Sequence, residues 1–244
     1  MKEVRFFYTP EPEAGQLPAD EAQHAVRVLR LQMGDEIFLM DGCGTFYRAI
    51  ITEATGHRCR YRIEEREAQQ PEWTGSIHLA VAPTKNMDRM EWLAEKATEV
   101  GFDHLSLLDC RFSERRVVKT DRLDKIIISA VKQSRKAWKP ILDEMMPFQK
   151  FIQRTDLPEQ RFIAHCHQFP AIASEAMAGN PFLLDILQPH TPALVLIGPE
   201  GDFSIEEVRA AEAVGFRSVS LGTSRLRTET AALVAVHLMR LANR

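Results

Sequence analysis

The stretch that decides the fold covers residues 193–204 and reads ALVLIGPEGDFS. Its first five residues are apolar, and a short apolar run bounded by turn residues is typical of a buried strand. The next four positions hold two glycines, a proline and an acid. Ser204 and Glu207 then have the spacing of a capping box, which opens a helix. The stretch therefore predicts a strand, a glycine-bearing loop and a helix in succession.

Comparable apolar runs recur on both sides of this unit, and segments of helical character separate them. One such helix should begin at Asn86, a favoured capping residue type, and end before Gly101. Strands that alternate with helices indicate an α/β fold with a parallel sheet covered on both faces. Further strands of this sheet are expected at residues 77–82, 104–108, 162–164 and 218–221.

The final helix, expected at residues 228–243, is apolar around most of its circumference. Helices of this kind are buried on more than one side. Contact with a second subunit and complete burial within one chain both account for the pattern.

The first 70 residues follow a different pattern, with short alternating strands and one helix over residues 21–30 that Asp20 can cap. Residues 41–44 resemble a hairpin turn between two of the strands. A polar segment containing Pro71 then marks a boundary. The sequence thus predicts a small, mainly β domain over residues 1–70 and the α/β domain over residues 71–244. The strands of the first domain are expected at residues 5–8, 36–40, 45–52 and 59–63.

Composition excludes several classes of protein. No stretch approaches the roughly 20 apolar residues of a membrane helix, and residues 1–5 lack a secretory apolar segment, so we expect a cytoplasmic protein without a membrane partner. The phosphate loop of nucleotide triphosphatases, the dinucleotide fingerprint and the nucleophile elbow of serine hydrolases are missing.

The cysteine and histidine pattern predicts no metal site. The four cysteines are scattered, and we expect reduced, mostly buried thiols. His165-Cys166-His167 is the only sequence cluster of metal-ligand types, but alternate residues at the end of a strand point to opposite faces. One ion could hardly take both histidines there. The cysteines are Cys43, Cys59, Cys110 and Cys166.

Charge is segregated, although the net charge is only −3. Residues 111–139 contain ten basic and three acidic residues, a balance of +7 within 29 positions. A solvated helix face usually interleaves both signs, whereas a one-signed run favours an anionic partner. A nucleic acid is the partner that this run favours, with the solvated face as the alternative.

A second loop of the same kind follows the strand expected at residues 218–221 and reads GTSRLRTETA over residues 222–231. Ligands of open α/β sheets bind at the carboxyl ends of the strands, where both loops must lie. Arg227 and Glu229 stand at the entrance of the apolar final helix, where burial is costly without a partner or ligand. Plain capping by Thr228 and Glu229 is the competing explanation. The two loops therefore predict a ligand pocket.

The amino-acid sequences of these two loops resemble those of one family. Leu196-Ile197-Gly198-Pro199-Glu200-Gly201, with Phe203-Ser204 and then Leu221-Gly222 and residues 226–231, is similar to the 16S ribosomal RNA (uridine-N3) methyltransferase family of the SPOUT class. The likeness continues upstream through Lys85, residues 96–99, residues 113–115 and Gln133-Ser134, and through Arg5-Phe6-Phe7 and residues 28–31 in the first domain. It covers nearly the whole chain.

The resemblance implies a trefoil-knotted α/β domain, an N-terminal RNA-binding, PUA-like β-barrel and a homodimer. It also implies methylation of uridine N3 in 16S rRNA of the small ribosomal subunit, with S-adenosyl-L-methionine as the donor. Donor-binding residues are then expected at Leu196, Ile197, Gly198, Pro199, Glu200, Gly201, Leu221, Gly222, Leu226, Arg227, Thr230 and Ala231. RNA contacts are expected from Arg5, Arg30, Arg115, Arg116, Arg135 and Lys136.

The proton acceptor for uridine N3 stays open, with Arg5, Arg227 and Glu229 as candidate catalytic residues and Glu200 as a second possible base. The chain departs from the family pattern at Asp202, where glycine is usual, at Ser224-Arg225 and at residues 132–136. Two rival functions are a non-catalytic RNA-binding or ribosome-assembly protein, and a SPOUT methyltransferase that acts on another RNA.

Overall fold

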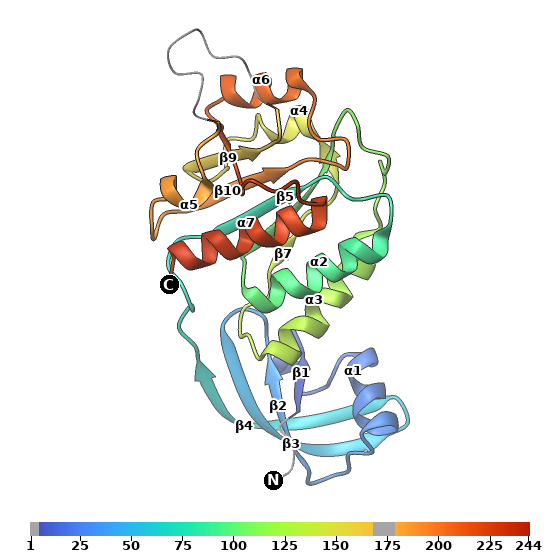
Figure 1. Cartoon of the computed structure of the whole chain (residues 1–244). Coiled ribbons are helices and arrows are strands. Elements are labelled where there is room, and N and C mark those ends of the chain that lie inside the picture. Colours follow the sequence, from blue (N-terminus) through green and yellow to red (C-terminus); the bar gives the residue numbers. More distant parts are fainter. Residues whose placement is uncertain (1–4, 168–178) are drawn as a thin grey trace, which may run out of the picture. The chain divides into compact units, whose positions relative to one another are not determined.

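The computed structural model describes residues 5–167 and 179–244, which form two compact units (Figure 1). The first unit contains Met1–Glu72 together with Ile128–Lys139, and the second contains Trp73–Ile127 and Pro140–Arg244. Helix α3 (Thr120–Ser134) contributes to both units. A segment from the middle of the chain therefore joins the N-terminal unit, which the composition change near Pro71 does not reveal.

The N-terminal unit is built on a four-stranded sheet in the order β1-β2-β3-β4. Strand β1 runs parallel to β2, and the other neighbours are antiparallel. One face of this sheet carries the buried core, which includes Phe7, Leu39, Ala49, Ile51 and Tyr61. The strands are β1 (Phe6–Tyr8), β2 (Glu36–Met40), β3 (Thr45–Thr55) and β4 (Arg58–Ala68).

The turn between β2 and β3 lies where the sequence predicts it. The carboxylate of Asp41 accepts hydrogen bonds from the backbone amides of Cys43 (2.7 Å) and Thr45 (3.0 Å), and from the hydroxyl of Tyr47 (3.1 Å). Gly42 and Gly44 have φ of 76° and 104°, which side chains rarely tolerate. The turn is thus fixed by one buried acid and two glycines.

The helical segment of this unit differs from the expected single helix capped by Asp20. A 3₁₀ turn (Pro12–Ala14) precedes α1 (Ala19–Gln23), whose cap position is Pro18, and a π-helical turn (His24–Val28) follows directly. The amide of Leu29 donates to the carbonyl of His24 (3.0 Å), the i to i+5 pattern of a π-helix. Apolar spacing over residues 22–29 suits either kind of turn, so sequence alone could not distinguish them.

The second unit is an α/β fold, as predicted. Its sheet has the order β11-β9-β10-β5-β6-β7, every pairing is parallel, and β8 pairs with β6. All residues of β5 and β10 are buried, which explains why β10 is entirely apolar and β5 is apolar except for His78. The strands are β5 (Ile77–Val81), β6 (His104–Asp109), β7 (Ile141–Leu142), β8 (Met146–Pro147), β9 (Gln160–Ala164), β10 (Ala193–Ile197) and β11 (Arg217–Val219).

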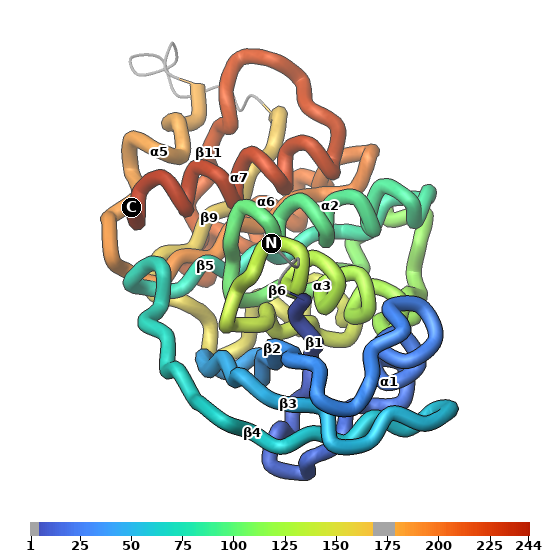
Figure 2. The backbone as a smooth tube through the Cα atoms, turned by 90° about the horizontal axis from the view of Figure 1, so that it is seen from below, coloured from blue at the N-terminus to red at the C-terminus, as the bar shows by residue number. Residues whose placement is uncertain are grey.

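Helices cover both faces of this sheet (Figure 1). On one face, α4 and α6 enclose a core that includes Phe148, Phe151, Leu194, Leu196 and Phe203. On the other, α7 packs against α2, β5 and β10, and α2 and α7 run side by side (Figure 2). The helices are α2 (Met87–Val100), α4 (Phe148–Phe151), α5 (Leu183–Ile186), α6 (Ile205–Ala213) and α7 (Thr228–Ala242).

The predicted boundaries of α2 are confirmed, because the side chain of Asn86 accepts from the amide of Asp88 (3.0 Å) and Gly101 follows with φ of 110°. The final helix buries Ala232, Ala235, Val236 and Met239 completely within the chain. Within the described ranges, no helix is long and apolar enough to cross a membrane.

Candidate methyl-donor site

A cleft of about 340 Å³ opens at the carboxyl ends of three neighbouring strands. The last residues of β9, β10 and β11, which are Ala164, Ile197 and Val219, all line it. They are adjacent because Ile197 and Val219 both pair with Ala164. The position agrees with the general rule for open α/β sheets, and the volume suits a small organic ligand.

Both predicted loops contribute to the lining. Of the expected donor-binding residues, Leu196, Gly201 and Thr230 lie outside the lining. Leu196 packs in the core that α4 and α6 enclose. Ten lining residues were not predicted for the donor, and they are Arg89, Ala164, His165, Cys166, Asp202, Val219, Ser220, Ser224, Arg225 and Thr228. The expected residues that do line the cleft are Ile197, Gly198, Pro199, Glu200, Leu221, Gly222, Leu226, Arg227 and Ala231.

The loop over residues 198–203 is folded tightly on itself. A Cβ atom added at Gly198 would lie 3.0 Å from the backbone nitrogen of Phe203 and 3.1 Å from the carbonyl carbon of Asp202. The amide of Asp202 donates to the carbonyl of Pro199 (2.9 Å). Ser204 and Glu207 form the predicted capping box and start α6. Gly198 is therefore required by close backbone packing.

Asp202 joins this loop to the segment that follows β9. One carboxylate oxygen accepts from the amide of Cys166 (2.8 Å), and the other accepts from the amide of Phe203 (2.8 Å). Asp202 has φ of 66°, a left-handed conformation that aspartate adopts more readily than most residues. The departure from glycine at this position thus keeps the loop conformation and adds two hydrogen bonds.

Glu200 connects the same loop to the segment between β5 and α2, because its Oε1 accepts from the amide of Lys85 (2.9 Å). The guanidinium of Arg115 donates to the carbonyls of Thr84 (3.3 Å) and Lys85 (2.6 Å). The sequence predicted Glu200 as a donor-binding residue or base and Arg115 as an RNA contact. In the structure, both side chains hold the backbone at Thr84 and Lys85.

The loop over residues 222–227 is open by comparison. Gly222 has φ of 126°, and its amide and carbonyl bond only to the hydroxyl of Ser220 (3.1 and 3.0 Å). The side chains of Ser224, Arg225 and Arg227 have no hydrogen bond or ion pair to any other residue that the structure describes. Arg227 occupies the cap position of α7 without a side-chain cap bond, so the capping explanation for Thr228 and Glu229 is not supported.

Glu229 lies behind the lining of the cleft. Its side chain is 10% exposed, and its Oε1 is 3.7 Å from the Nε of Arg89, which does line the cleft. Its Oε2 is buried and has no hydrogen-bond partner in the described part of the chain. This geometry suits a carboxylate that orients Arg89.

His165 and His167 do not point to opposite faces as predicted, because β9 ends at Ala164 and the strand alternation stops there. The two rings lie 5.6 Å apart. Each has a separate partner, since Nε2 of His165 contacts the hydroxyl of Ser218 (2.9 Å) and Nε2 of His167 contacts the carbonyl of Phe203 (2.6 Å). Burial lowers the pKa of His165.

The cysteines are free, but only Cys59 and Cys110 are buried, so the expectation of mostly buried thiols holds for half of them. Cys166 is exposed and lines the cleft. Burial raises the pKa of the Cys59 thiol to about 11.

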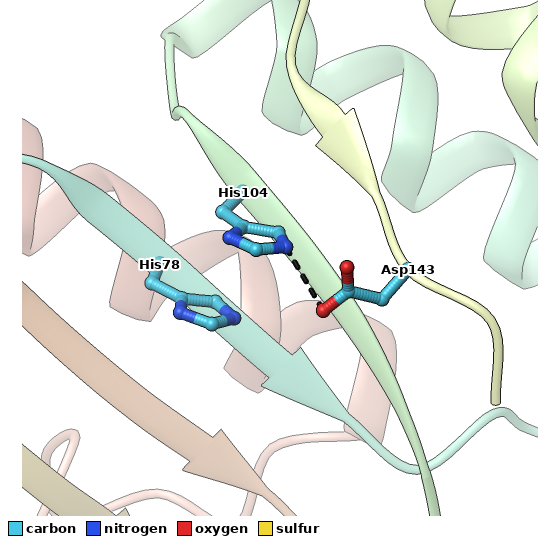
Figure 3. Close-up of side chains that lie close together, drawn as sticks. All are labelled: His78, His104 and Asp143. Carbon is cyan, nitrogen blue, oxygen red and sulfur yellow. Dashed lines mark ion pairs between the residues drawn. The ribbon is translucent and has the colours of Figure 1, made fainter. Parts of the chain in front are cut away.

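The structure brings together a cluster that sequence reasoning missed: His78, His104 and Asp143, whose ligand atoms lie within 4.8 Å of one another (Figure 3). Oδ2 of Asp143 is already 2.9 Å from Nε2 of His104 and accepts from Ser106 (2.6 Å) and Arg154 (3.1 Å). The guanidinium competes with any cation for this carboxylate, so we interpret the cluster as structural. Its members come from distant segments, which hid it from spacing rules.

The basic run over residues 111–139 is partly neutralised by acids outside it. At least five of its ten cations form ion pairs with such carboxylates in the described part of the chain, so the balance of +7 overstates the charge available to a partner. Arg116 pairs with Asp109 at 2.7 Å, and Lys136 is buried and pairs with Glu72 at 3.2 Å. The other pairs are Arg111–Glu206, Arg122–Glu91 and Lys132–Glu21.

Three other candidates for RNA contacts, Arg5, Arg30 and Arg135, form no ion pair within the described ranges. All three belong to the N-terminal unit. Arg30 and Arg135 are exposed and have φ of 53° and 55°. Of these three cations, only Arg135 belongs to the basic run over residues 111–139.

Comparison with known proteins agrees with this geometry. A family described as RNA methyltransferase domain matches residues 71–240, and one described as RNA methyltransferase PUA domain matches residues 17–64. A curated relative, the Ribosomal RNA small subunit methyltransferase E of Rickettsia conorii, is 28% identical over 228 residues, which are 93% of this chain and 89% of that protein.

Two solved structures are similar over 98% of this chain and 98% of their own. A probable rRNA-methyltransferase from Porphyromonas gingivalis has 42% identity and a TM-score of 0.88. The Ribosomal RNA small subunit methyltransferase E from Neisseria gonorrhoeae, bound to S-adenosyl methionine, has 27% identity and a TM-score of 0.81. The chain therefore belongs to the RNA methyltransferase domain family and carries a PUA-like domain at its N-terminal end.

Proposed function

We propose that this enzyme transfers a methyl group from S-adenosyl-L-methionine to N3 of a uridine in 16S rRNA of the small ribosomal subunit, in the cytoplasm. The observation that carries the proposal is the cleft at the ends of β9, β10 and β11, lined by both loops. The relatives named for small-subunit rRNA, one of them bound to the donor, support the same substrate and cofactor.

The residues of the cleft fit the donor. Residues 197–200 line the cleft from one loop, where Gly198 has no room for a side chain, and Leu221 and Leu226 add apolar surface from the other loop. When bound, S-adenosyl-L-methionine supplies an electrophilic methyl group on a sulfonium. The loops hold donor and acceptor in line, which can remove a large part of the barrier.

Uridine N3 must lose its proton before it can accept a methyl group, and the negative charge then spreads over the neighbouring base oxygens. Three arginines, Arg89, Arg225 and Arg227, line the cleft and can stabilise this anion. Of the two candidate bases, Glu200 lies in the lining with Oε1 bonded to Lys85, whereas Glu229 lies behind Arg89. We therefore assign Glu229 the positioning of Arg89 and retain Glu200, which lines the cleft, as the candidate base.

A base that exposes N3 cannot remain paired, so the substrate nucleotide must be unpaired or flipped. Arg5, Arg30 and Arg135, which form no ion pair within residues 5–167 and 179–244, supply charge for the phosphates. We further propose a homodimer, because Leu233, Val234 and Leu241 on α7 remain partly exposed in the single chain.

The test is to incubate the protein with isotope-labelled donor and either unmethylated small ribosomal subunits or transfer RNA, followed by nucleoside mass spectrometry. Labelled N3-methyluridine in the small subunit alone supports the proposal. Label on a ribose, or on transfer RNA only, would identify a different methyltransferase. No label in any RNA, with RNA binding retained, would identify a non-catalytic assembly protein. Gly198→Val serves as the inactive control.

A further inference from the structure

The face of the N-terminal sheet opposite the core carries three aromatic rings from three adjacent strands. Phe6, Phe38 and Phe46 alternate with the buried Phe7, Leu39 and Tyr47, so they point to the other side. The centroid of the Phe6 ring is 5.7 Å from that of Phe38 and 5.2 Å from that of Phe46. All three are only partly buried, which is unusual for a contiguous aromatic group.

The segment that follows α3 extends this surface within the same unit. The guanidinium of Arg135 lies 6.0 Å from the centroid of the Phe6 ring. The amide of Gly44 donates to the carbonyl of Ala137 (3.0 Å), which places Trp138 against the β2–β3 turn. A Cβ atom at Gly44 would lie 2.3 Å from the indole, so only glycine lets the ring approach, yet Trp138 stays 43% exposed.

Arg135 gives this surface an unusual electrostatic character. It is exposed and forms no ion pair with any described residue. Its φ of 55° is costly for a residue with a side chain. An unpaired arginine above an aromatic ring next to an exposed tryptophan offers a cation for a phosphate and π faces for bases. This combination is typical of surfaces that bind single-stranded nucleic acid.

We propose that Phe6, Phe38, Phe46, Arg135 and Trp138 form a stacking platform for unpaired RNA bases, in addition to the donor cleft. The proposal rests on the proposed function in one respect, that the substrate is RNA. Bases stack on the aromatic faces, and the guanidinium of Arg135 meets the backbone phosphate. The platform selects unpaired RNA over duplex, because paired bases do not expose their faces.

The test measures binding of a fluorescein-labelled octamer of uridine to the full-length protein by fluorescence anisotropy. Arg135→Gly removes the cation at a backbone conformation that glycine favours, and Trp138→Leu removes the exposed indole. We expect each to weaken binding by roughly tenfold, because one variant loses a phosphate contact and the other loses a stacked base. Arg58→Gln, an exposed arginine at the β3–β4 turn, is the matched control and should weaken binding by less than about twofold.

An octamer with abasic sites separates stacking from phosphate contacts. It should bind the wild-type protein more weakly than the uridine octamer, and Trp138→Leu should reduce this difference. Unchanged binding by Arg135→Gly and Trp138→Leu would overturn the proposal. Equal losses with Arg58→Gln would mean general charge attraction, and a changed sedimentation coefficient without RNA would mean a subunit contact. Either result overturns the platform. Methylation of small subunits is a separate readout, so failure of the platform and of the proposed function are distinguishable.

Discussion

The two loops that line the cleft are built in opposite ways. In residues 198–203, Asp202 bonds to two backbone amides, Glu200 bonds to a third, and Gly198 packs against its own loop. In residues 222–227, the structure shows side chains without polar partners among the described residues, and only Ser220 holds the backbone at Gly222. One side of the cleft is preorganised and the other is free to adjust.

This difference indicates that the two loops have separate roles in donor binding and in methyl transfer. A preorganised loop contributes affinity because little conformational freedom is lost on binding. An open loop with two arginines can reorganise around a second reactant and supply charge once that reactant is present. The first loop should therefore govern donor affinity, and the second should govern the rate of methyl transfer.

The largest effect is expected from Gly198→Val. The Cβ of the valine would meet backbone atoms at 3.0–3.1 Å and would force the loop over residues 198–203 open. Overpacking typically costs roughly 1–3 kcal/mol, so we expect donor affinity, measured by calorimetry, to fall by up to about a hundredfold. Gly179→Val is the matched control, since nothing lies within 4 Å of a Cβ there. Wild-type affinity of the Gly198→Val protein would remove the distinction between the loops.

Substitutions at Asp202 test the same loop, with a smaller expected loss of donor affinity. Asp202→Gly relieves the left-handed backbone conformation but removes the hydrogen bonds to Cys166 and Phe203. Bonds to a charged group each contribute roughly 1.5–3 kcal/mol, and partial compensation should leave donor affinity about tenfold weaker. Asp202→Asn keeps one acceptor oxygen and should give an intermediate affinity. Tighter donor binding by the glycine variant would show that strain at position 202 outweighs the bonds.

Arg227→Gln probes the open loop. We expect methyl transfer under donor saturation to slow by about fivefold, because one cation near the developing anion is lost, while donor affinity stays within about twofold. Arg209→Gln, an exposed arginine on α6 away from the cleft lining, is the control. A loss of donor affinity without a change in rate would reverse the roles of the two loops.

The smallest effect is expected from pH at His165, which holds the segment bonded to Asp202. Burial lowers its pKa from the ordinary value of 6.5, so the unfolded chain takes up a proton first as the pH falls. Its contribution to stability is therefore present above pH 6.5 and is lost progressively below it. We expect Tm to fall more steeply below pH 6.5 in the wild-type protein than in His165→Gln. Parallel curves for the two proteins would contradict this role.

The sequence predicted the parallel sheet, the caps of α2 and α6 and the position of the cleft, because these depend on local spacing and on the general placement of ligands at strand ends. It could not show that Asp202 bonds to Cys166, which lies 36 positions away. The partners of Arg116 and Lys136, and the meeting of His78 with Asp143, likewise depend on tertiary structure.

The basic run over residues 111–139 is the plainest case in which tertiary contacts escape prediction from the sequence. Charge density along the chain indicated an anionic partner for residues 111–139, yet five of its cations meet carboxylates from elsewhere in the fold. Arg135 differs because it lies on an aromatic ring and has no acid beside it within the described residues. The trefoil knot and the homodimer stay predictions from the family resemblance.

The most direct test of the account is a crystal structure of the protein with S-adenosyl-L-homocysteine, the demethylated donor. We predict density for the ligand in the cleft, against residues 197–200 on one side and residues 221–226 on the other, with the first loop unchanged and the second shifted toward the ligand. Density at another site, or an empty cleft at saturating ligand, would contradict the assignment of the two loops to the methyl donor.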